Sequence, residues 1–179
     1  EDVSEEIANV LQSEGIQIHL NSKVNKVSQK DGEIEISGDL SGNKQSYKGT
    51  HLLIATGRAP NTEGLNLEKA GVETNEKGHI KVNDKLETTA EGVYALGDVT
   101  GGLQFTHTSY NDYNILKQNL LGSNGQASKS DDRITYTVFT DPQIGRAGLN
   151  EKMAKERGIA YKVAKLPMES VARAIETSH

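Results

Sequence analysis

The segment Thr88–Asp98 constrains the fold of this chain most strongly. It joins a polar turn to the short apolar stretch Val93–Leu96 and ends in Gly97 and Asp98. Such a short run of apolar and β-forming residues predicts a buried strand. Glycine lets the backbone turn sharply and lets another backbone or a ligand come close. Asp98 therefore follows the carboxyl end of a predicted strand, where open α/β sheets bind ligands. Its carboxylate can accept hydrogen bonds from sugar-like hydroxyls.

The same run resembles the second flavin-binding motif of the FAD-dependent pyridine nucleotide-disulfide oxidoreductases. That family includes dihydrolipoamide dehydrogenase, glutathione reductase and mercuric reductase. Further stretches resemble family motifs in the family's order, and they are 51–61 (ATGRxPN), 64–85, 99–107 and 139–149. The resemblance covers nearly the whole chain. It implies an α/β fold with three parts: the C-terminal half of a nicotinamide-binding Rossmann-like domain, a second FAD-binding segment and the truncated start of an α+β dimerisation domain.

The resemblance also implies where the flavin binds. Asp98 would bind a hydroxyl of the ribityl chain, with Gly97 beside it. A helix N-terminus carries about half a positive charge and unpaired N–H donors, so it would stabilise the negative charge of reduced flavin. The last FAD contacts are implied at the start of a helix that continues to about residue 120. They are Gln104, Phe105, Thr106 and His107.

Contacts with the nicotinamide cofactor, NADH or NADPH, are implied at Gly57 and at the backbone near Val24. No residue of this chain is expected to be catalytic or to bind a metal ion. For His107 we weigh a capping or packing role slightly above proton transfer. Arg58 is expected to make a salt bridge at the domain junction, and His19 to be a strand residue without a catalytic role.

One position departs from the best-known family members. Those members read roughly LAHxAxxEG where this chain reads FTHTSYNDY, so Tyr113 replaces a small residue. A tyrosine there changes the packing near the flavin or the interface. This stretch of sequence resembles the mercuric-reductase-like and stress-response branches more than it resembles dihydrolipoamide dehydrogenase.

Several family features are missing from the sequence. It has no G-x-G-x-x-G loop to hold a pyrophosphate, and it has no cysteine for a redox disulfide. It opens on Glu1 without Met, and it stops before the region where the family places its His-Glu acid/base pair. We therefore interpret the chain as an internal fragment of a larger flavoenzyme.

Composition agrees with part of a cytoplasmic enzyme. The net charge of −5 gives no support to a nucleic-acid partner, and no run approaches the ~18 apolar residues of a membrane span. By resemblance we expect a homodimer formed through the C-terminal domain and a small-molecule or disulfide substrate. NADH or NADPH preference and the electron acceptor stay open, because the residues that read the ribose are expected upstream.

The pattern divides the chain into 1–57, 58–122 and 132–179, with a linker-like polar run at 123–130. A helix is predicted from an N-cap at Ser4 to Gly15, and another from Glu151 to Arg157 with Asn150 as its cap. Residues 168–177 are expected to form a loop or short helix. Strands besides that of 93–96 are predicted at 16–20, 24–30, 33–38, 44–50, 52–54, 134–139 and 160–166, with turns at 31–32 and 42–43.

Three functions are compatible with these observations. The first is an oxidoreductase that passes a hydride from NADH or NADPH through FAD to a disulfide, a metal ion or another small acceptor. The second is a non-catalytic fragment acting as a scaffold or dimerisation module. The third is a related flavoprotein without the disulfide, such as an NADH oxidase or a ferredoxin reductase. The 140–148 stretch argues against a ferredoxin reductase, because it resembles the dimerisation domain of the disulfide branch.

Overall fold

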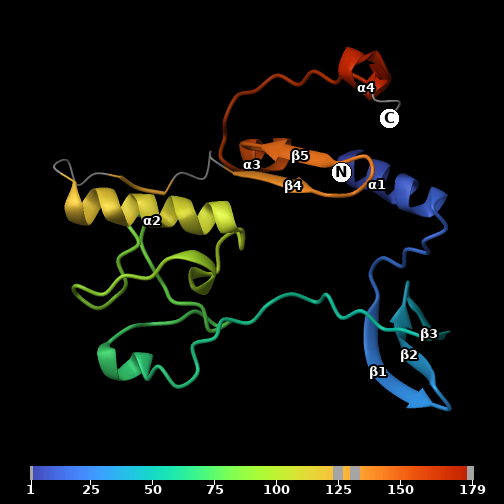
Figure 1. Ribbon diagram of the computed structural model, residues 1–179, viewed down its shortest axis with the longest axis horizontal. Helices are drawn as coiled ribbons and strands as arrows, with labels where there is room; N and C mark the ends of the chain where they lie inside the picture. The colour runs from blue at the N-terminus through green and yellow to red at the C-terminus, as the bar shows by residue number, and fades with distance from the viewer. Residues whose placement is uncertain (1, 123–126, 130–133, 177–179) are drawn as a thin grey trace. The chain divides into compact units, whose positions relative to one another are not determined.

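The computed structural model describes residues 2–122, 127–129 and 134–176. The chain forms two compact units, Glu1–Gly57 and Arg58–His179, which are considered separately below. Figure 1 shows the order of their elements, from blue at the N-terminus to red at the C-terminus.

The first unit begins with helix α1 (Asp2–Ser13). Its start differs from the prediction, because Ser4 lies inside the helix and is not its N-cap. Its end agrees with the prediction. Gly15 has a φ of 89° and donates its N–H to the carbonyl oxygen of Gln12 (2.9 Å). Glycine adopts this left-handed conformation at little cost, so it closes the helix.

A three-stranded antiparallel meander follows, in the order β1 (Lys23–Lys30), β2 (Glu33–Leu40) and β3 (Asn43–Gly49). Both hairpins turn on two residues with positive φ, as type I′ turns require: 31–32 at 53° and 82°, and 41–42 at 53° and 80°. The meander is confirmed, as is the first turn. The second turn lies one residue earlier than predicted, because Leu40 pairs with Asn43.

Four predicted strands do not form: 16–20, 52–54, 93–96 and 160–166. A strand needs a hydrogen-bonding neighbour, and within the described ranges none of these four segments joins a sheet. Leu53 and Ile54 are accordingly 89% and 73% exposed. Tyr94 makes only an isolated bridge with Glu87. His19 therefore lies in a loop, where its ring contacts Tyr47 (centroids 4.7 Å apart).

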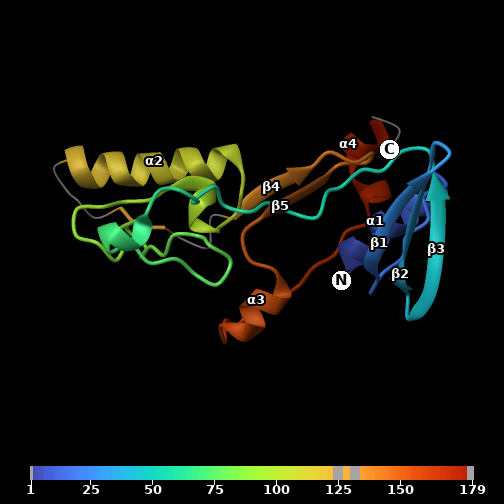
Figure 2. The ribbon, with the colours of Figure 1, turned by 90° about the horizontal axis from the view of Figure 1, so that it is seen from below.

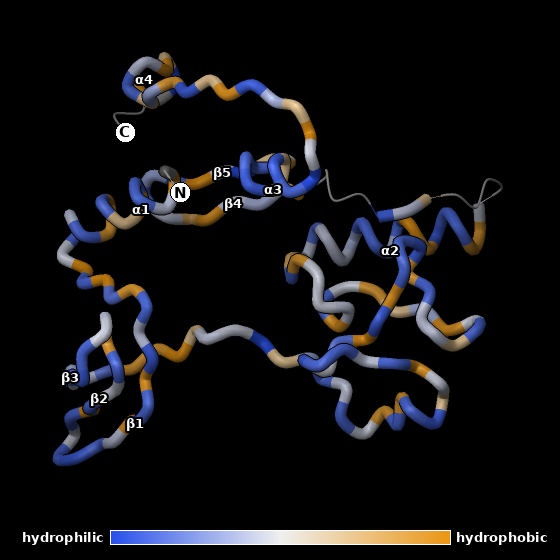
Figure 3. The backbone as a smooth tube through the Cα atoms, turned by 180° about the vertical axis from the view of Figure 1, so that it is seen from behind, coloured by the Kyte–Doolittle hydropathy of each residue, from blue (hydrophilic) through white to orange (hydrophobic). Residues whose placement is uncertain are grey.

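The second unit is built around helix α2 (Thr106–Leu121), which lies along a loop-rich segment with two short 3-10 helices, η1 (Leu67–Ala70) and η2 (Gly97–Thr100) (Figure 2). Two small apolar clusters form its core. One comprises Val72, Ile80 and Ala95, and the other joins Leu86 to Ile115 and Leu116 of α2. The predicted helix is confirmed, and its apolar residues lie in its second half (Figure 3).

The remainder of this unit is a β-hairpin followed by short helices. Strands β4 (Thr135–Val138) and β5 (Ile144–Ala147) pair antiparallel, and α3 (Glu151–Glu156) follows. As predicted, the Asn150 side chain caps α3 by accepting the N–H of Met153 (2.9 Å). The expected loop or short helix contains η4 (Met168–Ser170) and α4 (Ala172–Glu176). No helix in the described part of the chain is both long and apolar enough to cross a bilayer.

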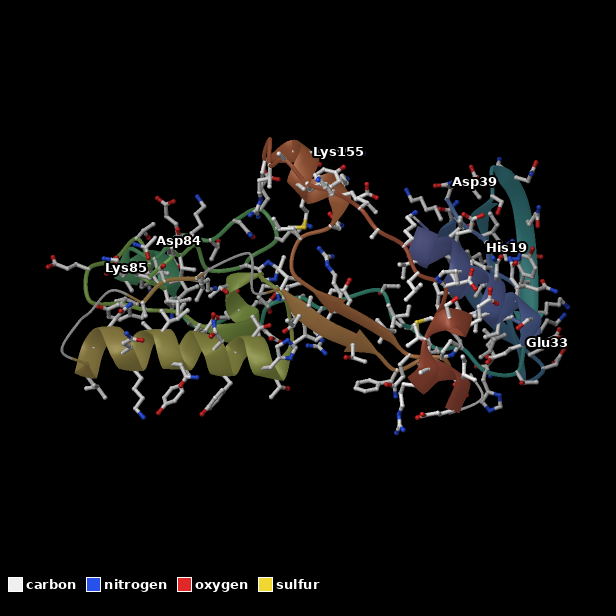
Figure 4. All side chains as sticks on the ribbon, turned by 90° about the horizontal axis from the view of Figure 1, so that it is seen from above. His19, Glu33, Asp39, Asp84, Lys85 and Lys155 are labelled. Atoms are coloured by element: carbon white, nitrogen blue, oxygen red, sulfur yellow. The ribbon has the colours of Figure 1, made fainter. Side chains whose placement is uncertain are left out.

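The meander carries an ion pair that gives a titration prediction. Lys48 Nζ donates to Glu33 Oε2 (2.8 Å), and this hydrogen bond and charge raise the pKa of Lys48 above its ordinary 10.5, with a smaller contribution from Glu35. Glu33 is labelled in Figure 4. Because the folded-state pKa is raised, the pair's contribution to stability is complete below pH 10.5 and is lost as the pH rises through the folded-state pKa.

We therefore expect Glu33→Gln to lower the pKa of Lys48 toward 10.5 and to leave thermal stability at neutral pH nearly unchanged, because exposed ion pairs contribute little. Titration of the Lys48 side chain by NMR measures the shift. Glu35→Gln is the matched control and should give a smaller decrease. An equal decrease in both variants would contradict the assignment to the Glu33 hydrogen bond.

Candidate functional site

The site is built on the turn that follows Ala95. This residue is buried and donates its N–H to the carbonyl oxygen of Leu86 (3.1 Å), so the stretch before the turn is fixed. Gly97 then adopts a φ of 74°, and Asp98 enters the 3-10 helix η2. The Thr100 hydroxyl donates to the carbonyl oxygen of Gly97 (2.9 Å). Backbone and side-chain bonds together hold Asp98 at one end of the site.

Arg58 is the ion-pair partner of Asp98. Its Nη1 lies 2.9 Å from Asp98 Oδ2 and also donates to the carbonyl oxygen of Gln104 (3.5 Å). The sequence predicted a salt bridge for Arg58 without naming its partner. The two side chains are 64% and 47% exposed, so the pair contributes little to stability. It places a carboxylate and a guanidinium side by side, both open to solvent.

A surface cleft of about 600 Å³ opens beside this pair. The structure thus brings together five of the six residues predicted to contact the flavin. The cleft is lined by Arg58, Leu96, Gly97, Asp98, Gln104, Phe105, Thr106 and Ser109.

The N-terminus of α2 lies at this cleft. Phe105 is the N-cap residue, has an extended backbone and makes no side-chain capping bond. The first N–H groups of an α-helix have no partner within the helix, and they carry the positive end of its dipole. With 16 residues, α2 is long enough to present that end at Thr106. The cleft therefore combines a hydrogen-bond-accepting carboxylate with a helix terminus that favours negative charge.

His107, the sixth predicted flavin residue, takes a packing position. Its ring stacks on Phe105 with centroids 5.4 Å apart and planes 11° apart. Its Nε2 lies 2.6 Å from the carbonyl oxygen of Thr135. A carbonyl only accepts, so Nε2 carries the hydrogen and donates it. The geometry favours the packing role over proton transfer.

Phe105 and His107 also line a second cleft of about 600 Å³, which reaches the β4–β5 hairpin. Tyr136 stacks on Phe105 (5.6 Å, 21°), and the Arg146 guanidinium lies 5.7 Å from the Tyr136 ring centroid. Sequence reasoning missed Tyr136 and Arg146, because alternate positions on a short strand give no sign of what they face.

Sequence reasoning also missed Asp112, whose side chain is 2% exposed. Its Oδ2 accepts the N–H of Gly97 (2.9 Å) and lies 3.3 Å from Lys129 Nζ. An available signal was its place on the apolar face of α2, three and four residues before Ile115 and Leu116.

Lys129 belongs to the run predicted as a linker. Residues 127–129 have no regular secondary structure, and the other residues of the run, 123–126 and 130, lie outside the described residues. Asn119 of α2 exchanges two hydrogen bonds with the backbone of Ala127, each 2.8 Å long. The Lys129 N–H donates to the carbonyl oxygen of Asp84 (2.8 Å). This segment is therefore packed against α2.

The two residues implied for the nicotinamide cofactor lie in the first unit. Val24 is in β1, is 49% exposed and pairs with Gly38 beside a register shift. Gly57 ends the unit with a φ of 115°.

Comparison with known proteins agrees with this geometry. Residues 1–112 match the family model described as pyridine nucleotide-disulphide oxidoreductase, and residues 134–178 match the dimerisation domain of that family. The chain belongs to the pyridine nucleotide-disulphide oxidoreductase family. Its α/β fold therefore corresponds to part of the main oxidoreductase region of the family together with dimerisation-domain sequence.

Among its relatives in this family is the probable pyridine nucleotide-disulfide oxidoreductase RclA of Escherichia coli K12. The two are 37% identical over 173 residues, which is 97% of this chain and 38% of RclA. A mercuric reductase of Staphylococcus aureus is 38% identical over 175 residues, covering 97% of this chain and 32% of the relative. A solved structure of E. coli RclA, described as a Cu(II) complex of an HOCl-induced flavoprotein disulfide reductase, matches with a TM-score of 0.84. Its identity is 37%, and the match covers 99% of this chain and 39% of that chain. This chain thus spans about two fifths or less of these relatives.

Proposed function

We propose that this chain is part of a flavoprotein oxidoreductase that passes a hydride from NADH or NADPH through FAD to a disulfide, a metal ion or another small acceptor. The carboxylate of Asp98 is the observation that carries the proposal. It stands at the wall of a 600 Å³ cleft beside the uncapped N-terminus of α2. The relatives support the chemical class, because their names describe flavoprotein, mercuric and pyridine nucleotide-disulfide reductases.

The residues of the cleft fit the ribityl chain and the ring of FAD. Asp98 offers carboxylate oxygens to ribityl hydroxyls, and Arg58 lies beside that carboxylate as its ion-pair partner (2.9 Å). Phe105 offers an aromatic surface, and Gln104 and Thr106 line the same cleft. We assign the pyrophosphate to another part of the protein, because this sequence has no glycine-rich phosphate loop.

Bound FAD would supply the hydride-accepting and electron-donating chemistry. The role of this chain is then to bind and orient. Asp98 would hold the ribityl chain, and the α2 N-terminus would favour negative charge on the bound flavin. His107 contributes packing through Phe105 and Thr135. Gly57 and the backbone near Val24 remain our proposed contacts for the nicotinamide cofactor.

We also propose the organisation of the complete protein. Residues 1–57 would belong to the NAD(P)-binding domain, 58–122 to the FAD-binding region and 132–179 to the dimerisation domain. The match of residues 134–178 to the family's dimerisation domain supports a homodimer. We propose a cytoplasmic location for it.

The alternative is a non-catalytic scaffold or dimerisation module. The absence of phosphate loops and cysteines from this sequence favours it. Against it stands Asp98, since a scaffold does not need a solvent-facing carboxylate at the mouth of a cleft. The flavoprotein is therefore the better-supported function.

An absorbance scan of the purified full-length protein between about 350 and 500 nm, where bound flavin absorbs, tests the proposal. NADH or NADPH is then added without oxygen. Flavin bands that bleach are the expected result. A colourless protein that stays colourless after incubation with FAD would overturn the oxidoreductase proposal in favour of the scaffold.

A further inference from the structure

We propose that the buried Asp112 and the partly exposed Lys129 form a positioning pair that fixes the Gly97–Asp98 turn, and with it the carboxylate offered to the flavin. This inference rests on the proposed function. It assigns a role to a helix residue and to a residue of the 127–129 segment, neither of which lines the Asp98 cleft.

The first observation is the burial of Asp112. Its side chain is 2% exposed, and Asp112 and His79 are the two buried polar or charged residues in the described ranges. A buried carboxylate must find donors, because its desolvation is otherwise costly. Asp112 Oδ2 has two, the backbone N–H of Gly97 (2.9 Å) and the ammonium of Lys129 (3.3 Å).

The second observation is that these bonds form a closed ring around the turn. Asp112 accepts the N–H of Gly97, and the carbonyl oxygen of Gly97 accepts the Thr100 hydroxyl (2.9 Å). Lys129 Nζ reaches that hydroxyl (3.5 Å) and the Asp112 carboxylate. Both polar backbone groups of Gly97, the residue directly before Asp98, are thereby held. The direction in which the chain enters Asp98 is fixed by the ring.

The third observation is that stability alone does not explain an ion pair at this place. Replacing a buried ion pair by apolar groups of similar volume is often neutral or stabilising. Asp112 stands among Ile115 and Leu116 on the buried face of α2, where an apolar side chain would serve a purely structural role. An apolar side chain could not bind the Gly97 N–H. The hydrogen bond to Gly97 therefore explains why a carboxylate, and not an apolar side chain, occupies position 112.

The experiment is a double-mutant cycle on the FAD dissociation constant of the full-length protein, stripped of flavin and titrated with FAD. We expect Asp112→Ala to raise the dissociation constant about 10-fold or more, as for loss of a hydrogen bond to a charged group. Asp112→Asn keeps an acceptor for Gly97 and should restore most of the affinity. In an Asp98→Ala background, Asp112→Ala should add less than about 2-fold, because it acts through Asp98.

Asn119→Ala is the matched control. It removes two hydrogen bonds between the same helix and the 127–129 segment without touching Gly97. It should lower the unfolding temperature and leave FAD affinity unchanged. Effects of Asp112→Ala that equal those of Asn119→Ala, or that add fully to Asp98→Ala, would overturn the positioning role.

Lys129→Met provides a second variant if Asp112→Ala does not fold. It keeps the apolar stem and removes the charge, and we expect weaker FAD binding. Unchanged FAD affinity in Lys129→Met would overturn the inference while leaving the flavoprotein proposal intact. A wild-type protein that takes up no FAD would overturn the proposed function and the inference together.

Discussion

Replacing Asp98 by alanine is expected to raise the FAD dissociation constant by about 10- to 100-fold, as for a lost charged hydrogen bond of roughly 1.5–3 kcal/mol. The flavin-free protein should unfold at nearly the wild-type temperature. The Asp98 side chain is 47% exposed, and its substitution breaks an exposed ion pair with Arg58, which contributes little to stability. Asp98→Asn keeps an acceptor and should fall between wild type and alanine. Titration of the stripped protein with FAD, followed by flavin fluorescence, measures all three.

Glu73→Ala is the matched control for this experiment. Glu73 is also an exposed carboxylate of the second unit, 63% exposed and paired with Lys81 at 2.9 Å, but it does not line the cleft. It should leave FAD affinity unchanged. Equal affinities for Asp98→Ala and wild type would remove Asp98 from the flavin site, and a similar loss in Glu73→Ala would point to a general charge effect.

Local chemistry explains which elements could be predicted from the sequence. The turns at 31–32 and 41–42 need positive φ at both positions, and an Asp-Gly pair announces the first of them. Asn150 predicts the start of α3 because its side chain can cap the helix, and Gly15 predicts the end of α1. Each of these signals is read within a few residues, so it does not depend on the rest of the fold.

Elements that depend on distant partners could not be predicted in this way. The apolar runs 52–54 and 160–166 have strand composition, but strand formation requires a neighbour that composition does not supply. The same limit applies to the site. Arg58 was expected in a salt bridge, yet its partner Asp98 lies 40 residues away. Lys129 lies in a polar run that gives no sign of its partner, because its ion pair with Asp112 forms only once the 127–129 segment packs against α2.

The second large effect is expected at Gly101, in the loop that joins Asp98 to the start of α2. Gly101 has a φ of 77°, and an added Cβ would lie 2.8 Å from Cγ of the buried His79 ring. The left-handed backbone costs an alanine about 1 kcal/mol or more, and forcing a methyl group into packed surroundings costs roughly 1–3 kcal/mol. We therefore expect Gly101→Ala to lower the free energy of unfolding by about 2–4 kcal/mol, measured by urea denaturation.

The neighbouring glycine makes this prediction specific. Gly102 has no positive φ, and an added Cβ there meets no atom within 4 Å, so Gly102→Ala should change the free energy of unfolding by less than about 0.5 kcal/mol. The same substitution, one residue apart, separates the general effect of losing a glycine from the combined cost of the left-handed backbone and the overlap with His79. Equal destabilisation by the two variants would contradict the packing of His79 against Gly101. Because Gly101 also donates its N–H to the carbonyl oxygen of Asp98 (3.1 Å), Gly101→Ala should weaken FAD binding as well, whereas Gly102→Ala should not.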